Sequence, residues 1–198
     1  MNPLMHGLVL TPLLLGPAAS AASTPSFDCR QVPPGSIPAL VCGDAALAAL
    51  DRSLASTYAA AAKIAVRQQP STLAAEQRGW IKGRDDCWKA PDRRACVEEL
   101  YRRRIAELQA SYRLVAFTGP VAWACDGQQA HELVVHFFRT EPPTLVAERG
   151  DSVSLMFQAP AASGSHYLGR NESFWEHQGE ARVQWGHGAP EMRCVRKP

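Results

Sequence analysis

The sequence predicts an α+β protein in which a small disulfide-linked helical bundle precedes a small antiparallel β-barrel. In the first half, apolar residues recur every three or four positions, which is typical of amphipathic helices. In the second half, short runs alternate apolar and polar residues between turn signals, which is typical of half-buried strands. The six cysteines form an even set, as expected of an exported protein with disulfides.

The composition is that of an ordinary globular protein with one or two small domains. The chain has 198 residues, of which 46% are hydrophobic, and 21 basic and 19 acidic side chains give a formal net charge of +2. This balance gives no electrostatic reason to expect nucleic acid as a partner.

The first 22 residues have the pattern of a signal peptide, although no Lys or Arg precedes the apolar run. That run, from Leu8 to Leu15, is followed by small residues at Ala18–Ala22 that suit a cleavage site. The segment is too short to span a membrane once Pro12 and Pro17 are counted. The first cysteine, Cys29, follows Asp28 rather than a small residue. We therefore expect a periplasmic or secreted protein without a stable membrane anchor.

Three helices are expected in the first half of the chain. Asp44 is a candidate N-cap for the first, because a carboxylate can accept hydrogen bonds from the free N–H groups of a first turn. A second helix is expected from Leu73 to near Cys87, and a third after a cap at Asp92. The preceding stretch, Thr24–Pro38, is rich in Pro and Gly and is expected to be irregular or extended.

The second half is expected to contain seven short strands separated by turns. Many short strands with regular turns favour a small antiparallel barrel or sandwich. The expected strands are Val121–Cys125, Glu132–Phe138, Leu145–Glu148, Ser152–Phe157, Ser173–His177, Ala181–Trp185 and Glu191–Val195.

The cysteine positions predict disulfides within each half. The six are Cys29, Cys42, Cys87, Cys96, Cys125 and Cys194. The last two are the only pair in the β half and would join its first and last strands, which contributes roughly 4 kcal/mol in the chain-entropy model. In the helical half, pairing of neighbouring cysteines is preferred and crossed pairing stays open. The spacings differ from those of zinc ribbons, so no metal is expected.

The stretch from Ser163 to Ala181 carries the main functional signal. A loop is expected at Ser163 and Gly164, and a strand beginning at Phe174 and Trp175 is expected to turn at Gly179. Loops at one end of a small β-structure can present a hydroxyl, an aromatic ring and an imidazole to the cleft of a partner. The alternative is a plain β-hairpin with Trp175 in the core.

This stretch resembles the signature of the membrane-bound lysozyme inhibitor of c-type lysozyme (MliC) family. The Ser-Gly-x-x-Tyr element of that family is matched here by Ser163, Gly164 and Tyr167, and the Phe-Trp pair and a Glu-Ala pair follow. The resemblance covers about residues 123–194. It implies that residues 119–198 form a barrel whose loops enter the active-site cleft of a c-type lysozyme.

The resemblance also implies which residues act. In the family, the Ser and a Lys after the Phe-Trp pair hydrogen-bond the catalytic carboxylates of lysozyme; here the Lys position is occupied by His177. An imidazole changes its charge near neutral pH, so Arg170 is a second candidate for the cation. The expected lysozyme-binding residues are Ser163, Gly164, Tyr167, Arg170 and His177.

The helical half resembles the N-terminal domain of the lysozyme inhibitor LprI family. The similarity runs over about residues 26–108, includes four cysteines, and is carried by the segment CGDAALAALDRSLASTY from Cys42 and by QRGW from Gln77. It implies an LprI-like helical domain at residues 26–110, with no inhibitory residue to assign.

No arrangement of residues indicates an enzyme. Ser163 is not in a Gly-x-Ser-x-Gly turn. His131 and His136 are five positions apart, on opposite faces of a strand, and are expected to be solvent-exposed rather than metal ligands. Arg102–Arg104 is expected to be a charged helix surface. We expect an inhibitor that needs no cofactor; the alternative is a periplasmic envelope protein that binds peptidoglycan.

Overall fold

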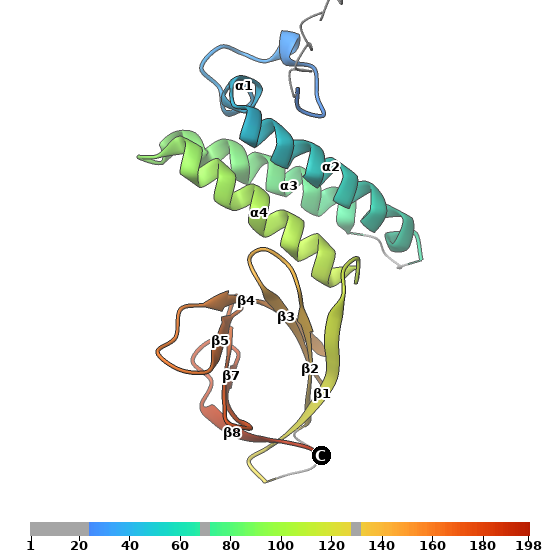
Figure 1. Ribbon diagram of the computed structural model, residues 1–198, viewed down its shortest axis with the longest axis vertical. Helices are drawn as coiled ribbons and strands as arrows, with labels where there is room; N and C mark the ends of the chain where they lie inside the picture. The colour runs from blue at the N-terminus through green and yellow to red at the C-terminus, as the bar shows by residue number, and fades with distance from the viewer. Residues whose placement is uncertain (1–23, 68–71, 128–131) are drawn as a thin grey trace, which may run out of the picture.

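The computed structural model shows a helical domain packed against the wall of a closed eight-stranded barrel (Figure 1). The structure describes residues 24–67, 72–127 and 132–198, so the expected signal peptide lies outside the described residues. The prediction of an α+β protein, with a helical bundle before an antiparallel barrel, is confirmed. Among the described residues, no helix combines the length and the apolar character needed to cross a membrane.

The helical domain contains four α-helices and two 3-10 helices within the described residues. They are η1 (Cys29–Gln31), α1 (Ile37–Gly43), α2 (Ala45–Ala65), α3 (Leu73–Asp85), η2 (Asp86–Lys89) and α4 (Arg93–Ser111). The expectation that Thr24–Pro38 is irregular or extended is wrong in part, because η1 lies within this stretch and α1 begins at its end. Pro38 lies in the first turn of α1, where proline is tolerated because its missing N–H would have no helical partner, and Ser36 caps this helix.

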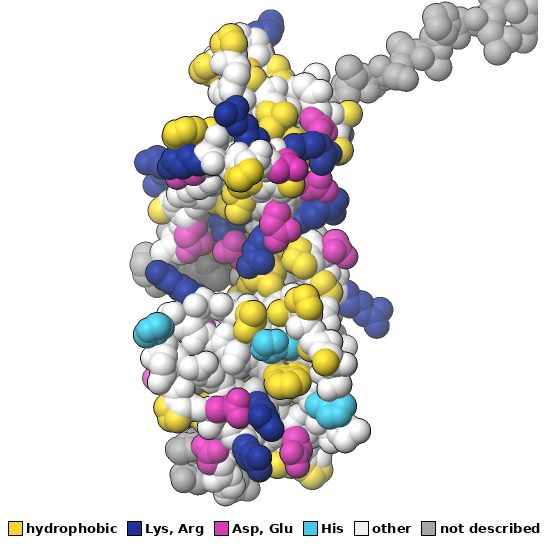
Figure 2. Space-filling view, turned by 90° about the vertical axis from the view of Figure 1, so that its left-hand side faces the viewer, with side chains coloured by type: hydrophobic (Ala, Val, Ile, Leu, Met, Phe, Trp, Pro, Cys, Tyr) yellow, Lys and Arg dark blue, Asp and Glu magenta, His cyan; other side chains and the backbone are white. Residues whose placement is uncertain are grey.

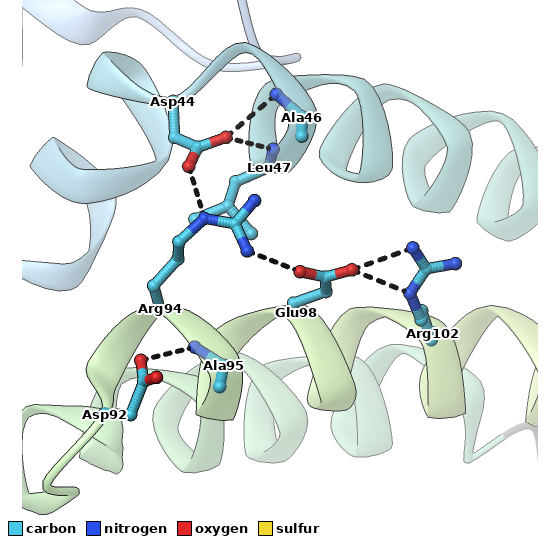
Figure 3. A network of polar contacts seen from close by, with 8 residues as sticks. All are labelled: Asp44, Ala46, Leu47, Asp92, Arg94, Ala95, Glu98 and Arg102. Atoms are coloured by element: carbon cyan, nitrogen blue, oxygen red, sulfur yellow. Dashed lines mark hydrogen bonds and ion pairs between the residues drawn. The ribbon is translucent and has the colours of Figure 1, made fainter.

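Two aspartates cap the long helices α2 and α4, as the sequence predicts (Figure 3). Asp44 accepts hydrogen bonds of 2.9 and 3.0 Å from N–H groups in the first turn of α2. It also accepts one of 2.7 Å from Nε of Arg94 at the start of α4. Arg94 in turn pairs with Glu98, which accepts from Arg102. The backbone hydrogen bonds, together with Arg94, lower the pKa of Asp44 below its usual value.

A chain of buried polar groups crosses the helical core. The hydroxyl of Tyr101 donates to Oδ1 of Asp51 at 2.8 Å and accepts from Nη1 of Arg84 at 2.8 Å. Asp51 also accepts from the backbone N–H and the hydroxyl of Ser26, both at 2.6 Å. Burial raises the pKa of Tyr101. Because buried polar groups require partners, this network constrains how α2, α3 and α4 pack.

The barrel contains eight antiparallel strands, and β8 pairs with β1 to close it. They are β1 (Phe117–Cys125), β2 (Glu132–Phe138), β3 (Thr144–Arg149), β4 (Ser152–Ala159), β5 (Ser165–Leu168), β6 (Glu172–His177), β7 (Glu180–Trp185) and β8 (Glu191–Arg196). The sequence predicts seven of these. The additional strand is β5, whose four residues follow the expected loop at Ser163 and Gly164 and had no element assigned to them.

Alternate side chains fill the barrel interior. Trp123 and Phe174 meet edge to face there, with their ring centroids 5.5 Å apart. The disulfide between β1 and β8 lies in this core, and all three preferred pairs are confirmed. They are Cys29–Cys42, Cys87–Cys96 and Cys125–Cys194. Three disulfides are characteristic of an oxidising, extracytoplasmic compartment.

Helix α4 packs against the outside of the barrel at β3 and β4 (Figure 1). The guanidinium of Arg103 stacks on the ring of Phe157, with its central carbon 3.9 Å from the ring centroid. Arg104 is only 3% exposed. The expectation that Arg102–Arg104 is simply a charged helix surface is therefore wrong for Arg104, because this residue lies where α4 is covered.

Candidate functional site

One pocket of about 520 Å³ opens on the outer face of the barrel, beside the loop between β4 and β5. We call it the Ser163 pocket, and its lining includes Ser163, Trp175, His177, Arg182, Arg193 and Val195. The structure thus brings together two of the predicted residues, Ser163 and His177. Figure 2 shows the side of the barrel on which β5, β7 and β8 lie, where histidine, basic, acidic and hydrophobic side chains are close neighbours.

Gly164 allows the loop that carries Ser163 to approach β6. Its φ is +68°, and a Cβ atom at this position would lie 2.1 Å from the carbonyl oxygen of Glu176 and 3.1 Å from Cβ of His177. Only glycine combines this backbone conformation with such a close approach. Gly164 therefore positions Ser163 beside the end of β6, where His177 lies.

Trp175 provides a second attachment for the same loop. Its indole Nε1 donates a hydrogen bond of 2.9 Å to the backbone carbonyl of Ser163. The neighbouring Phe174 is fully buried, whereas Trp175 is 38% exposed on the outside of the barrel. The alternative that Trp175 is a core residue is therefore wrong, because the alternation along β6 turns Phe174 inward.

The other two predicted residues lie elsewhere. Tyr167 is 7% exposed, and its ring packs against Phe137 in the barrel interior with centroids 5.8 Å apart. Burial raises the pKa of this tyrosine. Arg170 lies in the turn between β5 and β6, at the opposite end of β5 from Ser163, and lines a different pocket beside α4. These positions give Tyr167 a packing role and separate Arg170 from the Ser163 pocket.

Two arginines that sequence reasoning missed complete the Ser163 pocket. Arg182 and Arg193 are opposite each other on β7 and β8, and Arg182 is also opposite Trp175 on β6. Arg182 pairs with Glu191 at 3.7 Å. Alternation alone places both arginines outside, because their neighbours Ala181 and Cys194 are buried. The missing information was the strand register, which brings them next to Trp175.

The pocket is suited to carboxylates. Two guanidinium groups and the imidazole of His177 face a single acidic lining residue, Glu180. Guanidinium groups bind carboxylates through paired, charge-assisted hydrogen bonds. A hydroxyl at Ser163 adds a donor that is held in place by its loop.

The histidines do not form a metal site within residues 24–67, 72–127 and 132–198, where no group of three or more His, Cys, Asp or Glu could hold an ion. His136 is only 6% exposed, which contradicts the expectation that it is a solvent-exposed histidine. It is covered by Phe117, whose ring centroid is 5.5 Å away. His131 lies outside the described residues.

Comparison with known proteins agrees with this architecture. Residues 123–192 match the family described as membrane-bound lysozyme-inhibitor of c-type lysozyme, and residues 29–116 match the family described as lysozyme inhibitor LprI. The fold and the matched domains therefore define a protein of the lysozyme-inhibitor class. Both are families of inhibitors and not of enzymes, which confirms the prediction that this chain is not an enzyme.

The particular family follows from a match along nearly the whole chain. The lipoproteins LprI of Mycobacterium bovis and Mycobacterium tuberculosis are each 31% identical to it over 190 residues, which cover 94% of this chain and 93% of the relative. The chain belongs to the LprI family, with an MliC-type barrel as its second domain. The description of the MliC family names c-type lysozyme as the enzyme that its members inhibit.

The name of these relatives differs from our expectation that the protein has no stable membrane anchor. They are called lipoproteins. In this chain all six cysteines are in disulfides, and Cys29, the first of them, is bonded to Cys42. The lack of an anchor stays a prediction.

Proposed function

We propose that this chain inhibits c-type lysozyme by placing the Ser163 pocket of its barrel against the active-site cleft of the enzyme. The observation that carries the proposal is the juxtaposition of Ser163 and His177 at one exposed pocket. These two residues match the inhibitory Ser and Lys positions of the MliC family. The arginine pair on β7 and β8 adds positive charge beside them.

The proposed mechanism needs no chemistry by the inhibitor. Lysozyme cleaves its substrate with one protonated and one ionised carboxyl group. The hydroxyl of Ser163 can hydrogen-bond one of them, and a cation at the pocket can pair with the other. The exposed ring of Trp175 supplies contact area at low entropic cost. Occupation of the cleft then excludes the polysaccharide.

Arg193 is the best-placed cation. Arg170 points to a different pocket, and Arg182 is engaged with Glu191. Arg193 is exposed, lines the Ser163 pocket and forms no ion pair with the residues that the structure describes. A guanidinium keeps its charge at every pH at which lysozyme is assayed, whereas an imidazole does not.

The first prediction concerns Ser163. Replacing Ser163 by Ala should weaken inhibition of a c-type lysozyme on bacterial cell walls by about 1–3 kcal/mol, because a charged partner loses its hydrogen bond. The inhibition constant measures this effect. Ser152→Ala, at the exposed start of β4, is the matched control and should inhibit like the parent. Unchanged inhibition by Ser163→Ala would remove this hydroxyl from the site.

The second prediction assigns the cation. After correction for the pH profile of lysozyme itself, inhibition should change by less than about twofold between about pH 8 and pH 6, because arginine stays charged. Arg193→Gln should weaken inhibition about tenfold at each pH, and Arg170→Gln should have no effect. Inhibition that strengthens toward pH 6, and loses this dependence in His177→Gln, would assign the role to His177 instead.

The alternative of an envelope protein is tested in parallel. Sedimentation with purified peptidoglycan, in the absence of lysozyme, measures direct binding to the cell wall. A chain that sediments with peptidoglycan and leaves lysozyme active would replace the proposed function with the envelope-binding one.

A further inference from the structure

A second pocket, of about 420 Å³, lies between the helical domain and the barrel. We propose that it binds a small anionic ligand: a compact ring that carries a carboxylate or a phosphate group. We call it the interdomain pocket, and its polar lining consists of Arg103, Arg104, Glu107 and Ser111 from α4 and Arg170 from the turn between β5 and β6.

The charge of the interdomain pocket favours an anion. Three guanidinium groups face one carboxylate, Glu107, which pairs with Nη1 of Arg104 at 2.8 Å. Among the described residues, the one ion pair of Arg103 is a longer contact of 3.6 Å with Glu99 on the exposed helix surface. Arg170 forms no ion pair with any residue in the described part of the chain. Planar guanidinium groups match the geometry of carboxylate and phosphate oxygens.

Arg104 supplies an independent indication. It is 3% exposed, and its Nε donates to Oε1 of Gln77 at 3.1 Å. Its Nη2 is buried and has no hydrogen-bond partner among the described residues. Buried polar groups of native proteins nearly always have partners. An anion bound in the interdomain pocket, which Arg104 lines, would supply such an acceptor.

The apolar residues that line the interdomain pocket indicate the uncharged part of the ligand. Phe157 carries the stacked guanidinium of Arg103, and Trp80, Leu155 and Leu168 add apolar surface around it. A cavity of this size suits a small molecule held by apolar walls and a few polar groups. Ser111 and Glu107 are available to hydrogen-bond hydroxyl groups. A sugar acid or a sugar phosphate combines these properties.

The site needs both domains, because its arginines come from α4 and from the barrel. A ligand that binds only this docked arrangement stabilises it by mass action. The interdomain pocket is also separate from the Ser163 pocket, since Arg170 and Ser163 lie beyond opposite ends of β5. Lysozyme inhibition and anion binding can therefore be tested independently.

Isothermal titration calorimetry on the full chain tests the proposal with three probes: N-acetylmuramic acid, inorganic phosphate and uncharged N-acetylglucosamine. N-acetylmuramic acid should bind, and N-acetylglucosamine should not. Arg170→Gln, in an exposed turn, should weaken binding about tenfold or more, since a charge-assisted hydrogen bond is lost. The matched control is Arg78→Gln on the exposed side of α3, and it should bind like the parent.

The two anionic probes show whether the pocket recognises an anion alone or an anion attached to a ring. Binding of both supports a site for the anion itself, whereas binding of N-acetylmuramic acid alone supports a site that also requires the ring. The proposal is overturned if neither anion binds at concentrations on the order of 10 mM. It is equally overturned if N-acetylglucosamine binds as well as the acid, or if both Arg170→Gln and Arg103→Gln bind like the parent.

Discussion

His136 shows how one side chain can make the junction of the two domains sensitive to pH. It lies on the outside of β2, but Phe117 covers its ring, and its Nδ1 is buried without a hydrogen-bond partner among the described residues. Burial, and then the positive charge of Arg113, lower the pKa of His136; the negative charge of Glu148 opposes them. The segment that leaves α4 therefore covers a histidine that is more stable in its neutral form.

This arrangement predicts a pH dependence of stability. Histidine in an unfolded chain has a pKa of about 6.5, and folding lowers that of His136. The unfolded state therefore binds more protons as the pH falls, and the free energy of unfolding should decrease below about pH 6.5. Urea denaturation at pH 7.5 and pH 5.5 measures this change.

His136→Phe should lose less stability than the parent over this interval, because it cannot titrate. His187→Gln, which replaces an exposed histidine, should behave like the parent. An identical loss in the parent and in His136→Phe would show that other groups cause the pH dependence.

Among the secondary-structure elements, β5 and the loop before it determine the geometry of the Ser163 pocket. The loop crosses β6 so closely that Gly164 has no room for a side chain. It is also fixed by the hydrogen bond from Trp175 to Ser163. A serine that is prepositioned in this way loses little conformational freedom on binding, which favours affinity.

We predict that Gly164→Ala lowers both the stability of the protein and its inhibition of lysozyme. The new methyl group would displace the loop from β6, so unfolding should become easier by more than about 1 kcal/mol, and Ser163 should move out of place. Gly188→Ala is a sharp control, because φ is +65° at this position and no atom would lie within 4 Å of the new Cβ. Gly188→Ala should lower the free energy of unfolding through backbone strain alone and should inhibit lysozyme as well as the parent does. Normal inhibition by Gly164→Ala would contradict the prepositioning of Ser163.

At the scale of the whole molecule, the sequence was sufficient for a helical bundle followed by a β-barrel and for the Cys125–Cys194 pair, but it left the pairing of the other four cysteines open. Periodicity locates α2, α3 and α4, and the aspartates that begin α2 and α4 are confirmed as caps. It misses α1, whose Pro38 resembles a loop signal, and β5, which is too short to show an alternation. Such elements are stabilised by packing against distant parts of the chain rather than by local preference.

The candidate site was predictable only in part, for a related reason. Ser163 and His177 could be chosen from a motif, but Arg193 becomes part of the pocket only through the pairing of β7 with β8. Likewise, Arg104 and Arg170 are far apart in sequence and line one pocket only because the helical domain packs on the barrel. Periodicity indicates the face on which a residue lies, and the register and docking of elements decide its neighbours.

The disulfide that joins β1 to β8 also affects how the barrel would respond to proteases outside the cell. Cys125 and Cys194 are separated by 69 positions and enclose every loop from β1 to β8. A single cut in any of these loops leaves both fragments covalently joined, and the strands on either side keep their hydrogen-bonded neighbours. A nicked inhibitor can therefore remain one molecule, with the Ser163 loop still attached on at least one side.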